Sequence, residues 1–138
     1  MLSSDLVEKM EQARDILESN LQDPPPIAEL AHRVGMSETY LKTNFKISFG
    51  CTVGGFVLTQ RMELAKKLFR QGDMNVSEIA REVGYKHTTH FSAAFKKATG
   101  MSPKVFARLG QAAMALLVQV STLGLLEPRS AGVLLSIC

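Results

Sequence analysis

The sequence of 138 residues predicts an all-α fold in which two helix-turn-helix subdomains are joined by a long linker helix. The chain repeats one pattern, because residues 27–50 recur as residues 76–100 with matching alanine, glycine and phenylalanine positions. In each copy, apolar residues at helical spacing lie on both sides of a glycine, which is typical of two short helices joined by a tight turn. Almost no segment alternates apolar and polar residues as a strand would.

Residues 1–23 are predicted to form an N-terminal acidic amphipathic helix that is part of the first subdomain. We expect the helix itself over residues 5–21. The run from Asp23 to Pro26 should end it, because the residue before a proline avoids the helical conformation. One apolar stripe would bury this helix against its neighbours. The residues of that stripe are Val7, Met10, Leu17 and Leu21.

Residues 24–52 are predicted to form the first helix-turn-helix. Gly35 falls between its two helices, where a helix commonly ends at a positive φ that residues with a β-carbon resist. Ser37 is a suitable N-cap for the second helix. The apolar residues expected on the inner faces of the two helices are Ile27, Leu30, Ala31, Val34, Leu41 and Phe45.

Residues 53–72 are predicted to form one linker helix, because apolar residues recur there at positions i, i+4, i+7 and i+11. A helix from residue 53 to residue 70 would span roughly 27 Å at the standard rise per residue. The residues of this stripe are Leu58, Met62, Ala65 and Phe69.

Residues 73–109 are predicted to form the second helix-turn-helix and a closing helix. Gly84 supplies the turn, and Asn75 with Glu78 three residues later predicts a capping box at the start of the first helix of this unit. The apolar residues expected inside this unit are Val76, Ile79, Ala80, Val83, Phe91 and Phe95.

The sequence signals for the remaining helix starts differ from one helix to the next. The second helix of the second unit should begin at Lys86 or His87. Ser102 followed by Pro103 predicts a cap and a first-turn proline for the closing helix. Residues 110–138 form an apolar tail to which the sequence assigns no definite structure.

Charge is distributed unevenly along the chain. Residues 1–23 contain six acidic and two basic residues, whereas residues 24–108 contain thirteen basic and six acidic residues. Positive charge is therefore concentrated on the repeated region, as a polyanionic partner requires. Major grooves on one face of B-DNA recur about every 34 Å, so reading helices at the two ends of the linker would reach successive grooves. We therefore expect double-stranded DNA to be the partner.

The second helix of each unit carries polar side chains opposite its apolar face. Threonine can hydrogen-bond a base edge and offers a methyl group to thymine, and lysine reaches the acceptors of guanine. The residues predicted to read bases are Thr39, Lys42, Thr43, Thr88, Thr89 and Ser92. Side chains near the helix ends are expected to contact phosphates, which position a protein without reading sequence. The residues predicted to contact phosphates are Ser37, Tyr40, Lys46, Lys86, His87, His90, Lys96 and Lys97.

Three segments together resemble the DNA-binding domain of AraC/XylS-type bacterial transcription regulators, over about three-fifths of the chain. They are IAELAHRVGMSETYLKTNFK, the linker core Arg61-Met62-x-x-Ala65-x-x-Leu68, and VSEIAREVGY followed by HFSAAFKKATGMSPKVF. The resemblance implies seven helices, regulation at bacterial promoters and contact with RNA polymerase. We expect an activator, although the sequence leaves activation and repression open. The family often carries arginine where this chain has Thr43 and Ala93. The absence of these arginines predicts weaker guanine readout. The first unit keeps Lys42 among its predicted base-reading residues, whereas the second has small neutral residues there, so we expect the first unit to read more and the second mainly to hold the DNA.

The sequence favours neither an enzyme nor a metal or cofactor site. No serine, cysteine or carboxylate constellation resembles a catalytic site. His87 and His90 share a helix face, but no third ligand lies at suitable spacing nearby. Arg61 is expected to have a structural role in the linker, by pairing with a neighbouring acid, rather than to contact DNA.

The apolar tail supports an alternative function, a helical protein-interaction or oligomerisation module in which residues 110–138 drive self-association. Residues 109–126 are uncharged and just reach the length of a membrane span, but polar residues and glycines dilute them, so no membrane partner is expected. The first residues, MLSSDLVEKMEQ, lack the basic and apolar regions of a secretory signal. We therefore expect the protein to be cytoplasmic.

Overall fold

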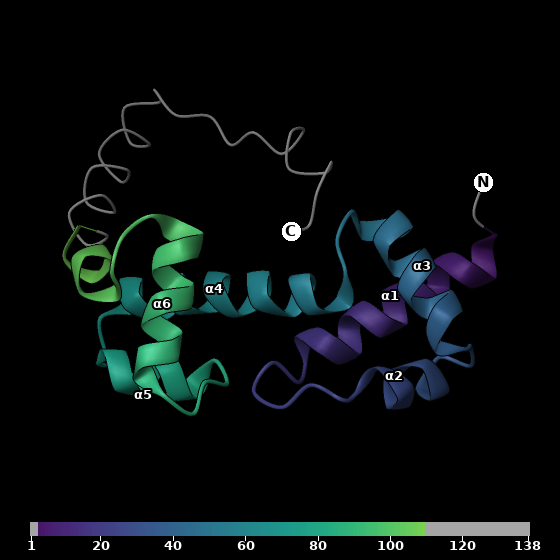
Figure 1. Ribbon diagram of the computed structural model, residues 1–138, viewed down its shortest axis with the longest axis horizontal. Coiled ribbons are helices and arrows are strands. Elements are labelled where there is room, and N and C mark those ends of the chain that lie inside the picture. Colours follow the sequence, from purple (N-terminus) through teal and green to yellow (C-terminus); the bar gives the residue numbers. More distant parts are fainter. Residues whose placement is uncertain (1–2, 110–138) are drawn as a thin grey trace, which may run out of the picture. The chain divides into compact units, whose positions relative to one another are not determined.

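A computed structural model describes residues 3–109 of the chain, and this part contains helices and no strands. The predicted all-α fold class, with two helix-turn-helix units and a linker helix, is confirmed (Figure 1). The last helix of this part covers residues 103–109. The other helices are α1 (Ser4–Glu18), α2 (Ile27–Arg33), α3 (Glu38–Phe49), α4 (Val53–Gln71), α5 (Val76–Glu82) and α6 (Thr88–Thr99).

The described residues divide into two compact units, and the boundary between Gln60 and Arg61 lies inside the linker helix α4. Each unit has its own apolar core. Phe56 and Val57 in the first part of α4 belong to the first core, and residues from Met62 onward belong to the second. The linker helix is therefore also a structural element of both units.

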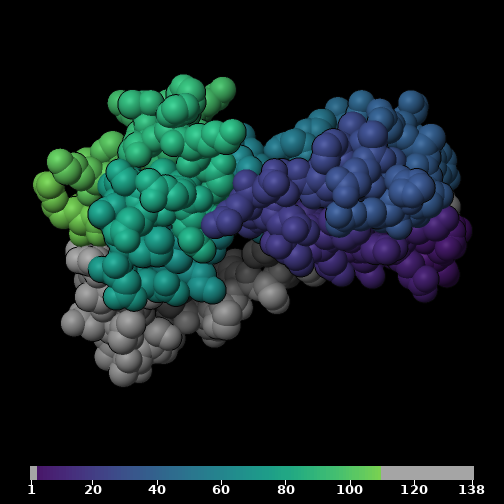
Figure 2. Space-filling view, turned by 90° about the horizontal axis from the view of Figure 1, so that it is seen from below, coloured from purple at the N-terminus to yellow at the C-terminus, as the bar shows by residue number. Residues whose placement is uncertain are grey.

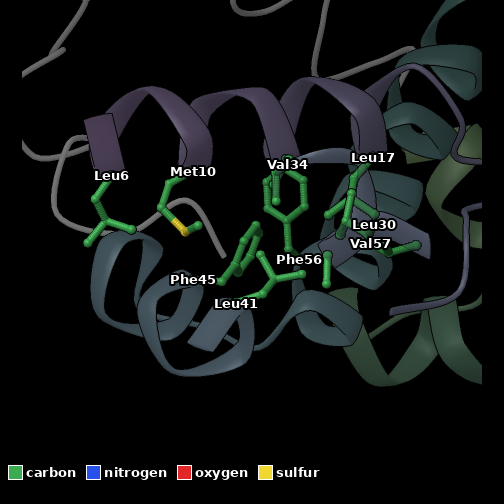
Figure 3. Packing of buried hydrophobic residues seen from close by; sticks show 11 residues of the cluster. Leu6, Met10, Leu17, Leu30, Val34, Leu41, Phe45, Phe56 and Val57 are labelled. Carbon is green, nitrogen blue, oxygen red and sulfur yellow. The ribbon is translucent and has the colours of Figure 1, made fainter. Parts of the chain in front are cut away.

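The core of the first unit is built from one side of α1, the inner faces of α2 and α3, and the start of α4 (Figure 3). Phe45 is fully buried, with ring centroids 4.6 Å from Phe49 and 5.6 Å from Phe56. In the space-filling view, α1 and the pair α2 and α3 lie against each other (Figure 2). The other residues buried in this core are Leu6, Met10, Ala13, Leu17, Leu30, Ala31, Val34, Leu41 and Val57.

Two details predicted for α1 are wrong. Val7 is 39% exposed, whereas Leu6 is buried in line with Met10 and Leu17, because neighbouring residues on a helix point about 100° apart. The helix also ends at Glu18 rather than at residue 21, with Ser19 as its C-cap. Leu21 still packs against the core, from the connection that follows the helix.

The second unit is held by the later part of α4 together with α5, α6 and the helix of residues 103–109. Phe95 lies at the centre, with ring centroids 5.4 Å from Phe69 and 5.2 Å from Phe106. Leu58 does not belong to this core, contrary to the predicted stripe, and is 45% exposed. In the part of α4 that precedes the unit boundary, Phe56 and Val57 are the residues buried in a core. The apolar stripe of Met62, Ala65 and Phe69 therefore does not continue back to Leu58. The other residues buried in this core are Ile79, Ala80, Val83 and Phe91.

The predicted turns and caps are confirmed where local sequence decides them. Gly35 and Gly84 have φ values of +72° and +105° and follow the first helix of each unit. Ser37 caps α3 by accepting a hydrogen bond from the backbone N–H of Tyr40 at 3.2 Å. The capping box at the start of α5 is present with both hydrogen bonds, and α6 begins directly after His87.

Among the described residues, no helix has both the length and the apolar composition needed to span a membrane. Residues 110–138 lie outside the described part of the chain. The proposed self-association of this tail and all but the first residue of the 109–126 stretch fall within it.

Candidate DNA-binding surface

The outer face of α3 carries a stripe of exposed polar side chains. Thr39, Lys42, Thr43 and Lys46 are all exposed at positions i, i+3, i+4 and i+7, which lie on one side of a helix. Leu41 and Phe45 are fully buried on the opposite side. Because both apolar anchors are held in the core, the stripe is fixed toward solvent.

A surface pocket of about 520 Å³ adjoins this stripe. It brings together three chain segments that are separate in the sequence: the start of α2, the outer face of α3 and the start of α4. The residues that line it are Ile27, Lys42, Thr43, Lys46, Thr52, Val53 and Gly54. The sequence predicts DNA contacts for the three α3 residues, Lys42, Thr43 and Lys46. It does not predict the pocket, because the pocket depends on how the helices pack.

The start of α3 is organised by hydrogen bonds within the helix. Ser37 is exposed and serves as the N-cap, and Tyr40 is 52% exposed beside it. Asn44 is buried, and its Nδ2 donates to the carbonyl oxygen of Tyr40 at 2.8 Å. The burial of Asn44 cannot be predicted from the sequence, because a polar residue next to an apolar stripe gives no sign of whether it faces inward.

The corresponding stripe on α6 consists of Thr89, Ser92, Ala93 and Lys96. Thr89, Ala93 and Lys96 are exposed and Ser92 is half-buried. Compared with α3, the second unit has serine in place of Lys42 and alanine in place of Thr43. The two reading helices therefore present chemically different surfaces, as the sequence indicates.

Thr88 differs from the other predicted base-reading residues. It is half-buried, and its Oγ1 donates to Ser77 Oγ at 3.4 Å. Ser77 is the second residue of α5, so this hydrogen bond joins the starts of the two helices of the second unit. The local sequence gives no sign of this role for Ser77, because Thr88 is eleven residues away along the chain.

Cationic and imidazole side chains surround both ends of α6. Lys86, His87 and His90 are exposed near its start, and the ring centroids of the two histidines are 5.2 Å apart. Lys96 and Lys97 are exposed in the last turn. In the described range, no group of three or more His, Cys, Asp or Glu side chains is placed to hold a metal ion.

The turn of the second unit is one residue longer than that of the first. Residues 34–37 separate α2 from α3, whereas residues 83–87 separate α5 from α6. The cap differs as well, because Ser37 accepts a hydrogen bond from the helix whereas the His87 side chain accepts none there. The repeated units therefore share an apolar framework but differ where their reading helices begin.

Arg61 is half-buried in the second unit, and its guanidinium carbon lies 5.4 Å from the ring centroid of Tyr85. The Tyr85 ring in turn lies 5.6 Å from that of Phe91. This arrangement connects α4 to the turn between α5 and α6. The sequence gives no sign of this aromatic contact, and the expected pairing of Arg61 with a neighbouring acid stays a prediction.

Several basic residues are occupied by ion pairs, whereas those on the reading helices are not. Lys9, Arg33 and Lys66 pair with Asp5, Glu29 and Glu63 at 3.3, 2.7 and 2.8 Å. Within residues 3–109, no acidic group pairs with Lys42, Lys46, Lys96 or Lys97. The charges of these four lysines are therefore available to an anionic partner.

This chain is similar to known proteins in both sequence and fold. A family model described as a helix-turn-helix domain matches residues 30–109. An uncharacterised HTH-type transcriptional regulator from Pseudoalteromonas carrageenovora is 35% identical over 92 residues, which are 67% of this chain and 54% of the relative. The chain thus spans about half the length of that relative.

Two solved structures extend the likeness to the fold. The C-terminal domain of AraT, a response regulator from Geobacillus stearothermophilus, superposes with a TM-score of 0.68 at 29% identity, covering 73% of this chain and 84% of that one. The DNA-binding domain of AdpA, a global transcriptional factor solved with a target DNA, gives a TM-score of 0.67 at 24% identity, covering 80% and 96%.

Proposed function

The chain belongs to the AraC-type family of helix-turn-helix transcription regulators, which bind DNA sequence-specifically, and we propose that α3 and α6 read two successive major grooves of a bacterial promoter. The observation that carries this proposal is the repeated stripe of exposed or half-buried side chains, opposite a fully buried aromatic anchor, on the second helix of each unit. In a helix-turn-helix, this second helix is the one that enters the major groove.

The length of α4 supports reading by a single chain. Its 19 residues span roughly 28 Å at the standard helical rise, close to the spacing of about 34 Å between grooves on one face of the duplex. Two half-sites about one helical turn apart are therefore expected in the DNA. A single chain would then contact an area that usually requires a dimer.

We assign base contacts to the short polar side chains of the two stripes, Thr39 and Thr43 on α3 and Thr89 and Ser92 on α6. Their hydroxyl and methyl groups suit base edges. Thr88 is already hydrogen-bonded to Ser77, so we assign it to the edge of the contact surface. The stripe of the second unit has no cationic residue before Lys96. This unit should therefore contribute mainly to affinity and less to sequence preference.

Phosphate contacts are assigned to the charged and polar groups at the helix ends. Each would add salt-dependent affinity without reading sequence. The residues proposed for this role are Ser37, Tyr40, Lys46, Lys86, His87, His90, Lys96 and Lys97. Contact with RNA polymerase, activation of transcription and a cytoplasmic location complete the proposal, and these rest on the family.

The proposal is tested by selecting bound sequences from a pool of random duplexes. We expect two preferred half-sites about 10 base pairs apart, with the stronger preference in one of them. Fluorescence anisotropy with a selected duplex and a scrambled one then measures specificity at several salt concentrations. If the selected sequences contain only one short half-site, the proposal that the chain reads two grooves is contradicted.

A further inference from the structure

The pocket beside α3 has a cationic edge and apolar walls. Lys42 and Lys46 lie one turn apart on α3, and both line the pocket together with Thr43. Ile27 at the start of α2 and Val53 at the start of α4 are half-buried and provide apolar surface. The volume of about 520 Å³ is larger than one inorganic anion requires.

Lys42 and Lys46 both line this pocket, and no acidic group of the described range competes for their charges. In the part of the chain that the structure describes, neither ammonium group forms an ion pair. Paired lysines elsewhere, such as Lys66 with Glu63, show that the surface does offer acidic partners to other bases. An anion entering the pocket would therefore meet two available positive charges.

The side of the pocket formed by α4 is open to close approach. Gly54 has no side chain, and a Cβ placed there would meet no atom within 4 Å apart from its chain neighbours and the backbone of its own helix. The hydroxyl of Thr52 already accepts a hydrogen bond from the backbone N–H of Gly55 at 3.0 Å. Next to Lys42 and Lys46, the pocket therefore offers the surface of Ile27 and Val53 to an apolar group of the ligand.

We propose that this pocket receives one phosphate of the DNA backbone with its attached deoxyribose, and that Lys42 and Lys46 both contact that phosphate. The sugar would lie against Ile27 and Val53. The inference rests on the proposed function and deepens it, because it makes Lys42 a positioning residue instead of the base-reading residue that the sequence analysis predicts. Sequence reading by α3 is then left to Thr39 and Thr43.

Neutral phosphate analogues test the proposal directly. A selected duplex is prepared with a methylphosphonate at one backbone position at a time, and affinity is measured for the wild type and for Lys42→Gln/Lys46→Gln. At one position, neutralisation should weaken wild-type binding about tenfold, as expected when a charged hydrogen bond is lost. The same duplex should bind the double variant no more weakly than the unmodified duplex does.

Matched variants separate charge from shape. Lys67→Gln removes an exposed lysine of α4 outside the pocket and should leave the methylphosphonate profile unchanged. Gly54→Leu fills the pocket without changing charge, and it should fold because leucine favours a helix more than glycine does. This variant should weaken binding of the unmodified duplex and remove the effect of the same methylphosphonate.

Two results would overturn the proposal. One is that, at every backbone position, the methylphosphonate weakens binding of the double lysine variant by the same factor as it weakens binding of the wild type. The other is that Lys42→Gln changes which base is preferred, as a base-reading residue would. A wild-type protein that binds no duplex even at low salt would instead overturn the proposed function, so the two failures are distinguishable.

Discussion

At Gly35 the backbone adopts a φ of +72°, and a Cβ built there would approach only the far end of the Lys9 side chain, at 4.0 Å. The position is therefore restricted by backbone conformation and not by space. Gly54 is restricted in neither way, because it lies in the first turn of α4, its φ is not positive, and its surroundings are open. Backbone conformation therefore requires glycine at position 35, whereas neither conformation nor space requires it at position 54.

Gly35→Ala should lower the free energy of unfolding by about 1–2 kcal/mol, the cost of a left-handed conformation for a residue with a β-carbon. Gly54→Ala should raise it by up to about 1 kcal/mol, because alanine favours a helix more than glycine does. Urea denaturation followed by circular dichroism measures both. Equal effects of the two substitutions would show that the strain expected at Gly35 is absent.

At the scale of the element, the starts of α3 and α6 offer a comparison within one chain. Ser37 has an extended backbone and caps α3 through its hydroxyl, whereas His87 has an extended backbone but its side chain makes no cap. The first turn of α6 therefore lacks a hydrogen bond that the first turn of α3 has. Cap chemistry predicts opposite effects of substitution at the two positions.

Ser37→Ala should destabilise the protein by about 1 kcal/mol, and Ser37→Gly by only a few tenths. His87→Ser should stabilise it by up to about 1 kcal/mol, because a serine side chain could accept a hydrogen bond at the start of α6. Thermal unfolding of the three variants checks the signs. A destabilising effect of His87→Ser would show that the imidazole contributes more than the missing cap.

The elements also show which features the sequence can predict. Caps, turns and helix starts depend on neighbouring residues, so Ser37, Gly84 and the capping box at Asn75 were predicted correctly. Which side of a helix is buried depends on its packing partners. The predictions for Val7 and Leu58 were wrong for that reason, since each extended a stripe by helical spacing alone.

Some features of the candidate site can likewise be predicted from the sequence, and others cannot. The exposed stripe on α3 follows from periodicity opposite Leu41 and Phe45, and the sequence predicted it. The hydrogen bond between Ser77 and Thr88 and the pocket beside Lys42 join residues from different helices. Nothing in the local sequence indicates those contacts, because the packing of each core brings the helices together.

At the scale of the whole molecule, affinity should depend on salt through lysines of both units. The logarithm of the association constant falls linearly with the logarithm of salt concentration, and each lost phosphate contact lowers the slope by about 1. Lys96→Gln/Lys97→Gln should therefore lower the slope by about 2. Lys66→Gln should leave it unchanged, because Lys66 is paired with Glu63. Anisotropy titrations at several salt concentrations measure the slopes, and an unchanged slope for the double variant would remove these lysines from the interface.

The continuity of α4 gives the last prediction. An insertion of two alanines between Gln60 and Arg61, at the boundary between the units, would lengthen the helix by about 3 Å and rotate its later part by about 200°. If the linker sets the direction in which the second unit faces the duplex, this variant should bind a two-half-site duplex no more tightly than a duplex with one half-site.

The control is the same insertion between Gln22 and Asp23, in the connection between α1 and α2, where no helix is interrupted. This variant should keep the wild-type preference for the duplex with two half-sites. Circular dichroism establishes that both variants are folded, and anisotropy with the two duplexes measures the preference. If the α4 insertion leaves the preference intact, the units orient themselves on DNA independently of the linker, and the linker is a tether rather than a spacer.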